Sequence, residues 1–322
     1  MIVDKAINEF MLYCKHEKNL SAKTLKAYGI DLSQFHKFTV EAHTTEISHI
    51  DRPLLRDFIA RLQSGYKPRT VRRKLAALKS FFTHLECEDI ETINPFRKLR
   101  LKLQYPTTLP KDISLPEIER LFQYLYRQRA LFTGDKPLSC DFKTLTRDIA
   151  IIELLFCTGM RVSELADLRL SNVDLLSSFF RVNGKGSRER IVSFGQEATV
   201  SAFKEYLSQY STIIVNTGCL FVNRSGRKLS SESIRAIVRK HASDAGISFR
   251  ITPHMFRHTT ATLLLEQGVD IRYIQALLGH SSIVTTEIYT KINPRQQNRI
   301  LEQKHPRRLI TASMETINRQ IP

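Results

Sequence analysis

The chain of 322 residues carries 49 lysines and arginines against 32 acidic residues, a net charge of +17 at pH 7. This length predicts two domains, and the positive excess favours a polyanionic partner such as nucleic acid. An apolar run of about 18 residues is absent, and the N-terminus MIVDKAINEF lacks a basic start followed by an apolar core. The sequence therefore predicts neither a membrane span nor a signal peptide, and we expect a cytoplasmic protein.

The first hundred residues are predicted to form four helices. Apolar residues at helical spacing mark the first one, and Ser21 is a candidate N-cap for the second. Pro53 and Pro68 suit the first turns of the third and fourth helices, because proline lacks the N–H that a helix start leaves unpaired. We expect the fourth helix to run to about Leu85.

The fourth helix separates an apolar stripe from a cationic face. The cationic face comprises Arg69, Arg72, Arg73 and Lys79. A solvated surface is the ordinary explanation of a charge run on a helix. The stretch PRTVRRKLAALKSFFTHL holds no acidic residue, however, and this favours contact with DNA phosphates.

Helical periodicity lapses near Asn94, and Pro106 and Pro110 flank a basic stretch of extended character. We therefore predict a break between domains near residue 106. The predicted organisation is a helical domain over 1–93, a linker over 94–112, a second domain over 113–294 and a C-terminal tail over 295–322.

The second domain is predicted to begin with a helix that Ser114 and Glu117 cap reciprocally, as in a capping box. A buried helix then ends at a break at Gly159, and a short helix starts near Val162 or Ser163. The next stretch, SFFRVNGKGSRERIVSF, alternates about a glycine-rich turn and predicts a β-hairpin.

Three more helices are expected, from about Ser230, from Pro253, and across IRYIQALLG up to Gly279. The predicted fold class is therefore mainly α with a small β-sheet. The helix from Pro253 gathers cations in PHMFRH at its N-terminus, where the helix dipole disfavours positive charge. A bound phosphate would offset this, because helix N-termini bind anions.

Six residues stand in motifs along the second domain. They are Arg161 in CTGMRVSEL, Lys185 in GKGSRER, His254 and Arg257 in PHMFRH, His280 in LLGHSSIVTT, and Tyr289 in EIYTKI. In this order they resemble the tyrosine recombinases, the family of phage integrases and Xer-type recombinases, over essentially the whole chain. The resemblance implies a SAM-like helical core-binding domain and an α+β catalytic domain.

The resemblance also implies roles for these residues in breaking and rejoining DNA. Arg161 and Arg257 bind the phosphate, Tyr289 attacks it, His254 is the base, Lys185 protonates the departing 5′ oxygen, His280 hydrogen-bonds the phosphate and Glu164 supports the site. Arginine suits such a role because its planar, permanently charged guanidinium matches paired phosphate oxygens. A phosphotyrosine keeps the free energy of the ester, so we expect no cofactor and no ATP-binding loop.

The partners implied by the resemblance are double-stranded DNA with a specific core site and three further copies of the chain. We expect a homotetramer on DNA and a monomer or weak dimer when free, associated with the nucleoid. Ile300 and Leu301 in the tail are expected to dock on a neighbouring subunit as part of a subunit-exchange helix.

Other interpretations remain open. His254, His258 and His280 are candidate zinc ligands, but Met255 stands where an H-E-x-x-H motif needs glutamate, and the five cysteines form no C-x-x-C pair. We therefore predict no metal and interpret His258 as a supporting or packing residue. A monomeric type IB topoisomerase would share the chemistry, and a DNA-binding regulator would be expected to lack catalytic side chains, of which none is lacking.

Overall fold

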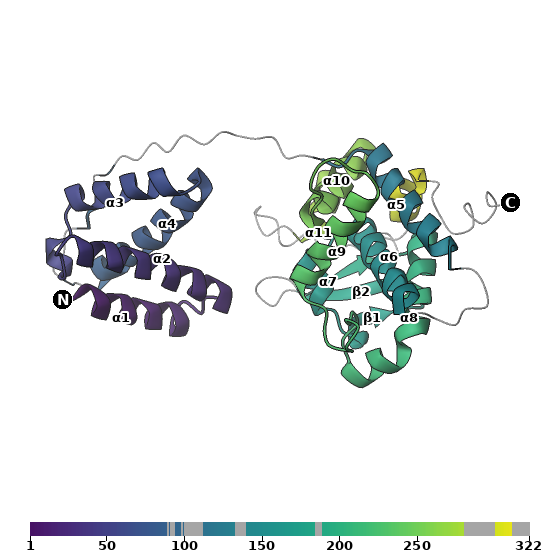
Figure 1. Cartoon of the computed structure of the whole chain (residues 1–322), viewed down its shortest axis with the longest axis horizontal. Helices are drawn as coiled ribbons and strands as arrows, with labels where there is room; N and C mark the ends of the chain where they lie inside the picture. The colour runs from purple at the N-terminus through teal and green to yellow at the C-terminus, as the bar shows by residue number, and fades with distance from the viewer. Residues whose placement is uncertain are drawn as a thin grey trace. The chain divides into compact units, whose positions relative to one another are not determined.

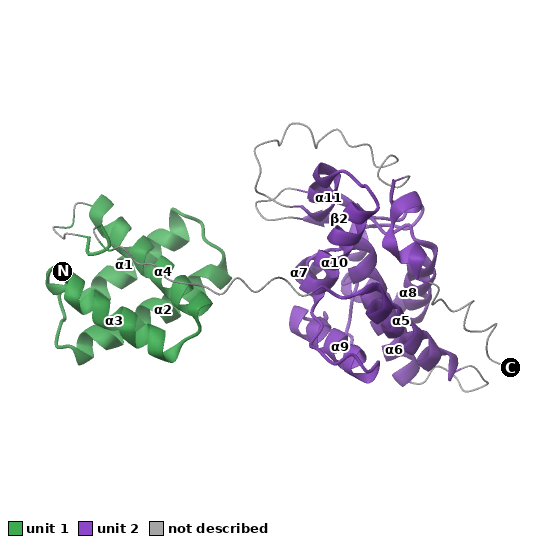
Figure 2. Ribbon diagram, turned by 90° about the horizontal axis from the view of Figure 1, so that it is seen from above, with its two compact units in different colours: residues 1–109 green, residues 110–322 purple. Residues whose placement is uncertain are grey.

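The computed structural model describes residues 1–88, 90, 94–97, 99, 112–132, 140–183, 189–279 and 300–310. The chain divides into two compact units, Met1–Leu109 and Pro110–Pro322 (Figure 2). The division falls within the stretch 94–112 that we expected to be a linker. In the described ranges, no helix combines the length and the apolar character that crossing a membrane requires.

The N-terminal unit is a helical bundle (Figure 1). Its elements are α1 (Val3–His16), α2 (Ala22–Glu41), the 3-10 helix η1 (Ile47–His49), α3 (Arg52–Gly65) and α4 (Pro68–Cys87). The helices begin where the sequence predicts: the Ser21 hydroxyl accepts a hydrogen bond from the Thr24 N–H at 3.2 Å, and the Asp51 carboxylate caps α3 in the same way. Four phenylalanines are fully buried in the core of this unit: Phe10, Phe35, Phe81 and Phe82.

The C-terminal unit combines helices with a small sheet (Figure 1). Its elements in chain order are α5 (Leu115–Ala130), α6 (Cys140–Thr158), α7 (Val162–Asp167), η2 (Leu170–Asn172), β1 (Val173–Asp174), β2 (Phe179–Asn183), β3 (Glu189–Ser193), α8 (Glu197–Thr217), α9 (Ser231–Asp244), α10 (Pro253–Glu266), α11 (Ile271–Leu278) and η3 (Pro306–Leu309). The predicted capping box is present, since Glu117 accepts a hydrogen bond from the Ser114 N–H at 2.9 Å. The fold class, mainly α with a small β-sheet, is confirmed.

The sheet is antiparallel, in the order β1-β2-β3. Strands β2 and β3 form the predicted hairpin, and β1 adds a short third strand that the sequence did not indicate. Phe180 pairs with Val192 across the hairpin, and both are buried. The Phe180 and Phe194 rings stack with their centroids 4.3 Å apart. Both rings pack against Phe203, which joins the sheet to α8.

Helix α6 is the central element of this unit. Nearly every residue from Leu145 to Thr158 is buried, and the helix packs against α5, α8, α9 and α10. From Ile149 to Cys157 the one charged residue is Glu153, and a helical stretch that is nearly apolar on all sides is expected to lie in the core. Because α6 ends at Thr158, the loop that carries Arg161 starts directly from this buried helix.

Residues 300–310, the described part of the predicted tail, pack against their own unit, whereas we expect Ile300 and Leu301 to dock on a neighbouring subunit. Residues 300–304 are helical, Leu301 is 3% exposed, and Ile300 is partly buried against the core of the same unit. His305 is also buried and donates a hydrogen bond from Nε2 to the Cys157 carbonyl at 2.8 Å. Leu301 therefore lies in the core of its own unit, and Ile300 packs against that core.

Candidate active site and DNA-binding surface

Gly159 creates the break that positions Arg161. Its φ of +58° is a left-handed conformation that favours glycine, and a Cβ atom here would lie 2.7 Å from Cδ2 of Leu278. The chain therefore turns at Gly159 while staying in contact with α11. Arg161 follows as the N-cap of α7.

Arg161 is held by the acidic residue predicted to support it. Glu164 accepts hydrogen bonds from the Arg161 backbone N–H at 2.9 Å and from its Nη1 at 2.8 Å. The Arg161 Nη2 donates to the carbonyl of Gly279 at 2.9 Å. The side chain remains 34% exposed, so Arg161 is anchored at its tip without being enclosed.

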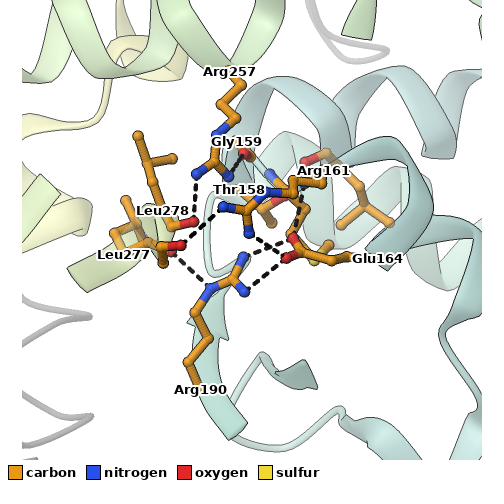
Figure 3. Close-up of polar contacts among 11 residues, drawn as sticks. Thr158, Gly159, Arg161, Glu164, Arg190, Arg257, Leu277 and Leu278 are labelled. Atoms are coloured by element: carbon orange, nitrogen blue, oxygen red, sulfur yellow. Dashed lines mark hydrogen bonds and ion pairs between the residues drawn. The ribbon is translucent and has the colours of Figure 1, made fainter. Parts of the chain in front are cut away.

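Arg257 reaches the same place from α10 (Figure 3). Its Nη1 donates to the Gly159 carbonyl at 2.9 Å, and its Nη2 donates to the Leu278 carbonyl. Burial and the nearby charges of Arg161 and Arg190 lower the pKa of Arg257 to about 10, so the guanidinium remains charged at neutral pH. The structure thus brings Arg161, Arg257 and Glu164 together at the end of α11.

His254 lies near the N-terminus of α10 and is exposed. Burial of part of the ring lowers the pKa of His254, and the charges of Arg257, Arg235 and Arg161 lower it further. The imidazole is therefore neutral at pH 7 and is able to accept a proton, because an unperturbed histidine already titrates near ~6.5. This protonation state suits a general base.

His258, which we interpret from the sequence as a supporting or packing residue, lies on the surface of α10. Its side chain is exposed, and its Nε2 lies 3.2 Å from Oδ1 of Asp112, so the two form an ion pair when the histidine is protonated. Among the described residues, no group of three or more histidine, cysteine or acidic side chains gathers as metal ligands would. His280, the third member of the zinc interpretation, lies outside those residues.

Three predicted catalytic residues lie outside the described residues: Lys185, His280 and Tyr289. Lys185 belongs to the sequence between the end of β2 at Asn183 and the start of β3 at Glu189. His280 and Tyr289 belong to the sequence between Gly279, which ends α11, and Ile300.

Sequence reasoning missed Arg190, which joins the same cluster from β3. Its Nη1 and Nη2 donate to the two carboxylate oxygens of Glu164 at 3.0 and 2.8 Å, and its Nε donates to the Leu277 carbonyl at 3.2 Å. A signal was present in the hairpin. Arg190 pairs with buried Val182 and shares a strand face with buried Val192, and an arginine on an inward face requires polar partners.

The cationic face predicted on α4 is exposed in the N-terminal unit. It includes Arg69, Arg72, Arg73 and Lys79. The face is not free of acid, because Asp31 of α2 is buried beneath it. Arg73 hydrogen-bonds Asp31, and Lys74 Nζ donates to the same carboxylate at 2.9 Å. Arg73 is therefore partly committed within the unit, which the sequence of α4 alone does not indicate.

Family models match both units. The model of the phage integrase family matches residues 119–296, and that of the phage integrase N-terminal SAM-like domain matches residues 7–89. A tyrosine recombinase of Agathobacter rectalis is 42% identical over 302 residues, which are 94% of this chain and 96% of the relative. The tyrosine recombinase XerD of Staphylococcus aureus is 34% identical over 313 residues, 95% of this chain and all (100%) of the relative.

Solved structures share the fold. The post-cleavage complex of XerH recombinase with a palindromic difH substrate superposes with a TM-score of 0.66 at 24% identity, covering 90% of this chain and 81% of that one. A lambda integrase(75–356) dimer bound to a COC′ core site gives 0.66 at 17% identity, covering 88% and 96%. With both units matched and curated relatives aligned over nearly its whole length, the chain belongs to the phage integrase family of tyrosine recombinases.

Proposed function

We propose that the chain cleaves one strand of duplex DNA at a specific core site and joins it to a new strand through a 3′-phosphotyrosine intermediate. Tyr289 is the nucleophile. Attack of its phenol oxygen on the scissile phosphorus breaks the bond to the 5′ oxygen, which leaves with a proton from Lys185. The phosphotyrosine ester conserves the energy of the broken bond, so a second DNA 5′ hydroxyl reverses the step without ATP or another cofactor.

The meeting of Arg161 and Arg257 at the end of α11 is the observation that carries this proposal. Negative charge builds on the non-bridging oxygens as the phosphorus becomes five-coordinate, and preoriented cations stabilise that charge. Arg257 is held by two backbone carbonyls, and Arg161 by a carboxylate and a carbonyl. Both guanidinium groups therefore have fixed positions before DNA binds, as preorganised transition-state stabilisation requires.

His254 supplies the base in this scheme, with His280 as a further hydrogen-bond donor to the phosphate. A phenol titrates near ~10, so Tyr289 needs a proton acceptor to react at neutral pH. The lowered pKa of His254 keeps its imidazole in the accepting form. The same arginine charges that lower this pKa also favour ionisation of a nearby phenol.

The proposed partners are two duplex core sites and three further copies of the chain. A lambda integrase tetramer bound to a Holliday junction shares this fold, with a TM-score of 0.66 at 16% identity. A ring of four identical subunits needs one patch that is donated and a different patch that accepts it, so that the contacts close. We propose that the free protein is a monomer or weak dimer and that the ring forms on DNA.

The experiment has two steps because the target site is unknown. Random duplexes carrying a nick are incubated with the protein, and those that become covalently attached are sequenced to obtain a core site. Two duplexes with that site are then tested for recombinant product, and a supercoiled plasmid without it is tested for relaxation. Recombinants restricted to paired sites support the proposal. If the protein relaxes the plasmid that lacks the site and forms no recombinants between paired sites, it acts as a type IB topoisomerase instead.

A further inference from the structure

The C-terminus of α11 is held by arginines from three separate elements (Figure 3). The carbonyl of Leu277 accepts from Arg190 of β3, that of Leu278 from Arg257 of α10, and that of Gly279 from Arg161 before α7. The last carbonyls of a helix lack partners within the helix and carry partial negative charge. Three cations thus bind three consecutive carbonyls, and the two phosphate-binding arginines are positioned against the same structural element.

Arg190 differs from its two neighbours in how completely its guanidinium is used. Both terminal nitrogens bind the two oxygens of Glu164 in a fork, and Nε binds Leu277. Among the described contacts, the guanidinium groups of Arg161 and Arg257 bind the protein through their terminal nitrogens alone. All three nitrogens of the Arg190 guanidinium therefore face the protein, so Arg190 is placed to orient other groups rather than to bind a phosphate.

Glu164 connects Arg190 to Arg161. The carboxylate accepts hydrogen bonds from both guanidinium groups and from the Arg161 backbone. Burial alone would raise the pKa of Glu164, but hydrogen bonds and charge from Arg190, together with hydrogen bonds from Arg161, lower it to about 2. Without Arg190, the hydrogen bonds from β3 to the Glu164 carboxylate would be lost. Of the two arginines that hydrogen-bond this carboxylate, Arg161 would remain, and the orientation of the carboxylate would be less well fixed.

Gly279 allows Arg190 to reach the helix end. Its φ is +68°, and a Cβ atom on it would lie 3.1 Å from the Arg190 Cζ. Only glycine leaves room for the guanidinium beside this turn without displacing it. Arg190 and Gly279 together therefore allow β3 and the end of α11 to lie close to each other.

We propose that Arg190 is a positioning residue for the phosphate-binding arginines: it orients Arg161 through Glu164 and fixes the end of α11, without touching DNA. This inference rests on the proposed function, because it assigns Arg190 to the same strand-cleavage step. It predicts that loss of Arg190 slows cleavage by misplacing positive charge, while leaving the affinity for DNA unchanged.

The test compares two substrates at saturating DNA. One is an ordinary nicked duplex, and the other carries a methylphosphonate at the scissile position, where a methyl group replaces a non-bridging oxygen and removes the negative charge. Arg190→Met should lower the cleavage rate on the ordinary duplex by about 100-fold, the scale of losing one oxyanion-stabilising donor. Most of that deficit should disappear on the neutral substrate. Arg190→Lys should be intermediate, since lysine keeps the charge but cannot bind Glu164 in a fork.

Arg224→Gln is the matched control. Arg224 also binds a carboxylate, that of Asp141 at 3.1 Å, but at the first turn of α6 rather than beside its last. This variant should cleave both substrates like the unmodified protein. Near-normal cleavage of the neutral substrate by Arg190→Met also shows that this variant folds.

A double variant tests whether Arg190 acts through Arg161. If it does, Arg161→Gln combined with Arg190→Met should cleave no more slowly than Arg161→Gln alone, because rate effects of residues that act through one another are not additive. Equal slowing on both substrates, or effects that multiply in the double variant, would overturn the inference. Failure of the unmodified protein to cleave any duplex would instead overturn the proposed function.

Discussion

Arg307 donates two hydrogen bonds to Glu153 across 154 residues of sequence, from Nε to Oε2 at 2.9 Å and from Nη2 to Oε1 at 2.7 Å. Both side chains are buried, and the Arg307 guanidinium also lies over the ring of Phe122. Tyr126 and Thr199 donate to the same carboxylate at 2.7 and 3.0 Å. The segment Pro306–Leu309 is thus fixed to the central helix α6 by a fully buried ion pair.

Glu153→Gln should destabilise the C-terminal unit strongly. Removing one partner of a buried pair leaves the other charge uncompensated, which costs about 3–5 kcal/mol. Chemical denaturation followed by circular dichroism measures the change in the free energy of unfolding. Glu232→Gln, which breaks an exposed contact with Arg235, is the control and should change it by less than about 1 kcal/mol. Equal effects of the two substitutions would contradict the buried arrangement.

Deleting the chain after Pro294 should abolish the covalent adduct and recombination together. The deletion removes Leu301, His305 and Arg307 from the core of their own unit and leaves Glu153 without its cation. Ending the chain after Ile310 keeps every described contact and is the matched control, which should fold and form adduct normally. If the shorter chain still formed adduct on a single site, the tail would not be the structural element that its burial indicates.

Stability should fall in mild acid because of His305. Burial lowers the pKa of His305 to about 4, and the neutral ring satisfies both nitrogens: Nε2 donates to the Cys157 carbonyl, and Nδ1 accepts from the Arg307 N–H. The unfolded histidine titrates near ~6.5, so between that pH and about 4 the unfolded chain binds more protons than the folded one. The stability due to this difference is fully present above pH ~6.5 and is lost as the pH falls toward 4.

The measurement is the free energy of unfolding across this pH range, for the unmodified protein and for His305→Gln. At about 1.4 kcal/mol for each pKa unit, lowering the pKa from 6.5 to about 4 corresponds to a loss of about 3.5 kcal/mol. The variant should show a flatter profile, because its side chain does not titrate. Profiles of equal slope would exclude His305 as the source of acid sensitivity.

If the cationic face of α4 contacts DNA phosphates, it should contribute to the salt dependence of DNA binding. Each side chain that no longer neutralises a DNA phosphate should reduce the slope of log K against log salt by about 0.9. We expect this for Arg69→Gln, Arg72→Gln and Lys79→Gln, measured by filter binding across a salt series. Lys5→Gln is the control, since Lys5 lies on α1 rather than α4, with its Nζ 3.9 Å from Oε1 of Glu9 on the same helix. Arg73 is unsuitable here, because its removal would also weaken the pairing of buried Asp31. Unchanged slopes in all three variants would indicate that the cationic face of α4 is an ordinary solvated surface that does not contact DNA phosphates.

Local signals in the sequence were sufficient for most of the helices. Ser21, Ser114 and Pro68 mark helix starts through interactions within one or two turns, and Gly279 ends α11 in the left-handed conformation expected of a C-terminal glycine. These features depend on neighbours close in sequence, which a single sequence displays directly.

The contacts between distant residues were not accessible in this way. Arg190 and Glu164 are 26 residues apart, and Arg307 and Glu153 are 154 apart, so neither pair leaves a periodic trace. The burial of Leu301 in its own unit likewise depends on tertiary packing. An amphipathic segment presents the same apolar pattern to its own core as to another subunit, which is why the tail was interpreted as a docking helix.

The proposed function depends on the covalent linkage of Tyr289 to DNA. The most direct measurement incubates the unmodified protein and Tyr289→Phe with a nicked duplex in EDTA, separates adducts under denaturing conditions and maps the DNA-linked peptide by mass spectrometry. We expect an adduct on Tyr289 in the unmodified protein and, for Tyr289→Phe, equal DNA binding with no adduct, because only the nucleophilic oxygen is lost. A stable adduct in Tyr289→Phe, or a linkage mapped to any other residue, would contradict the proposed function.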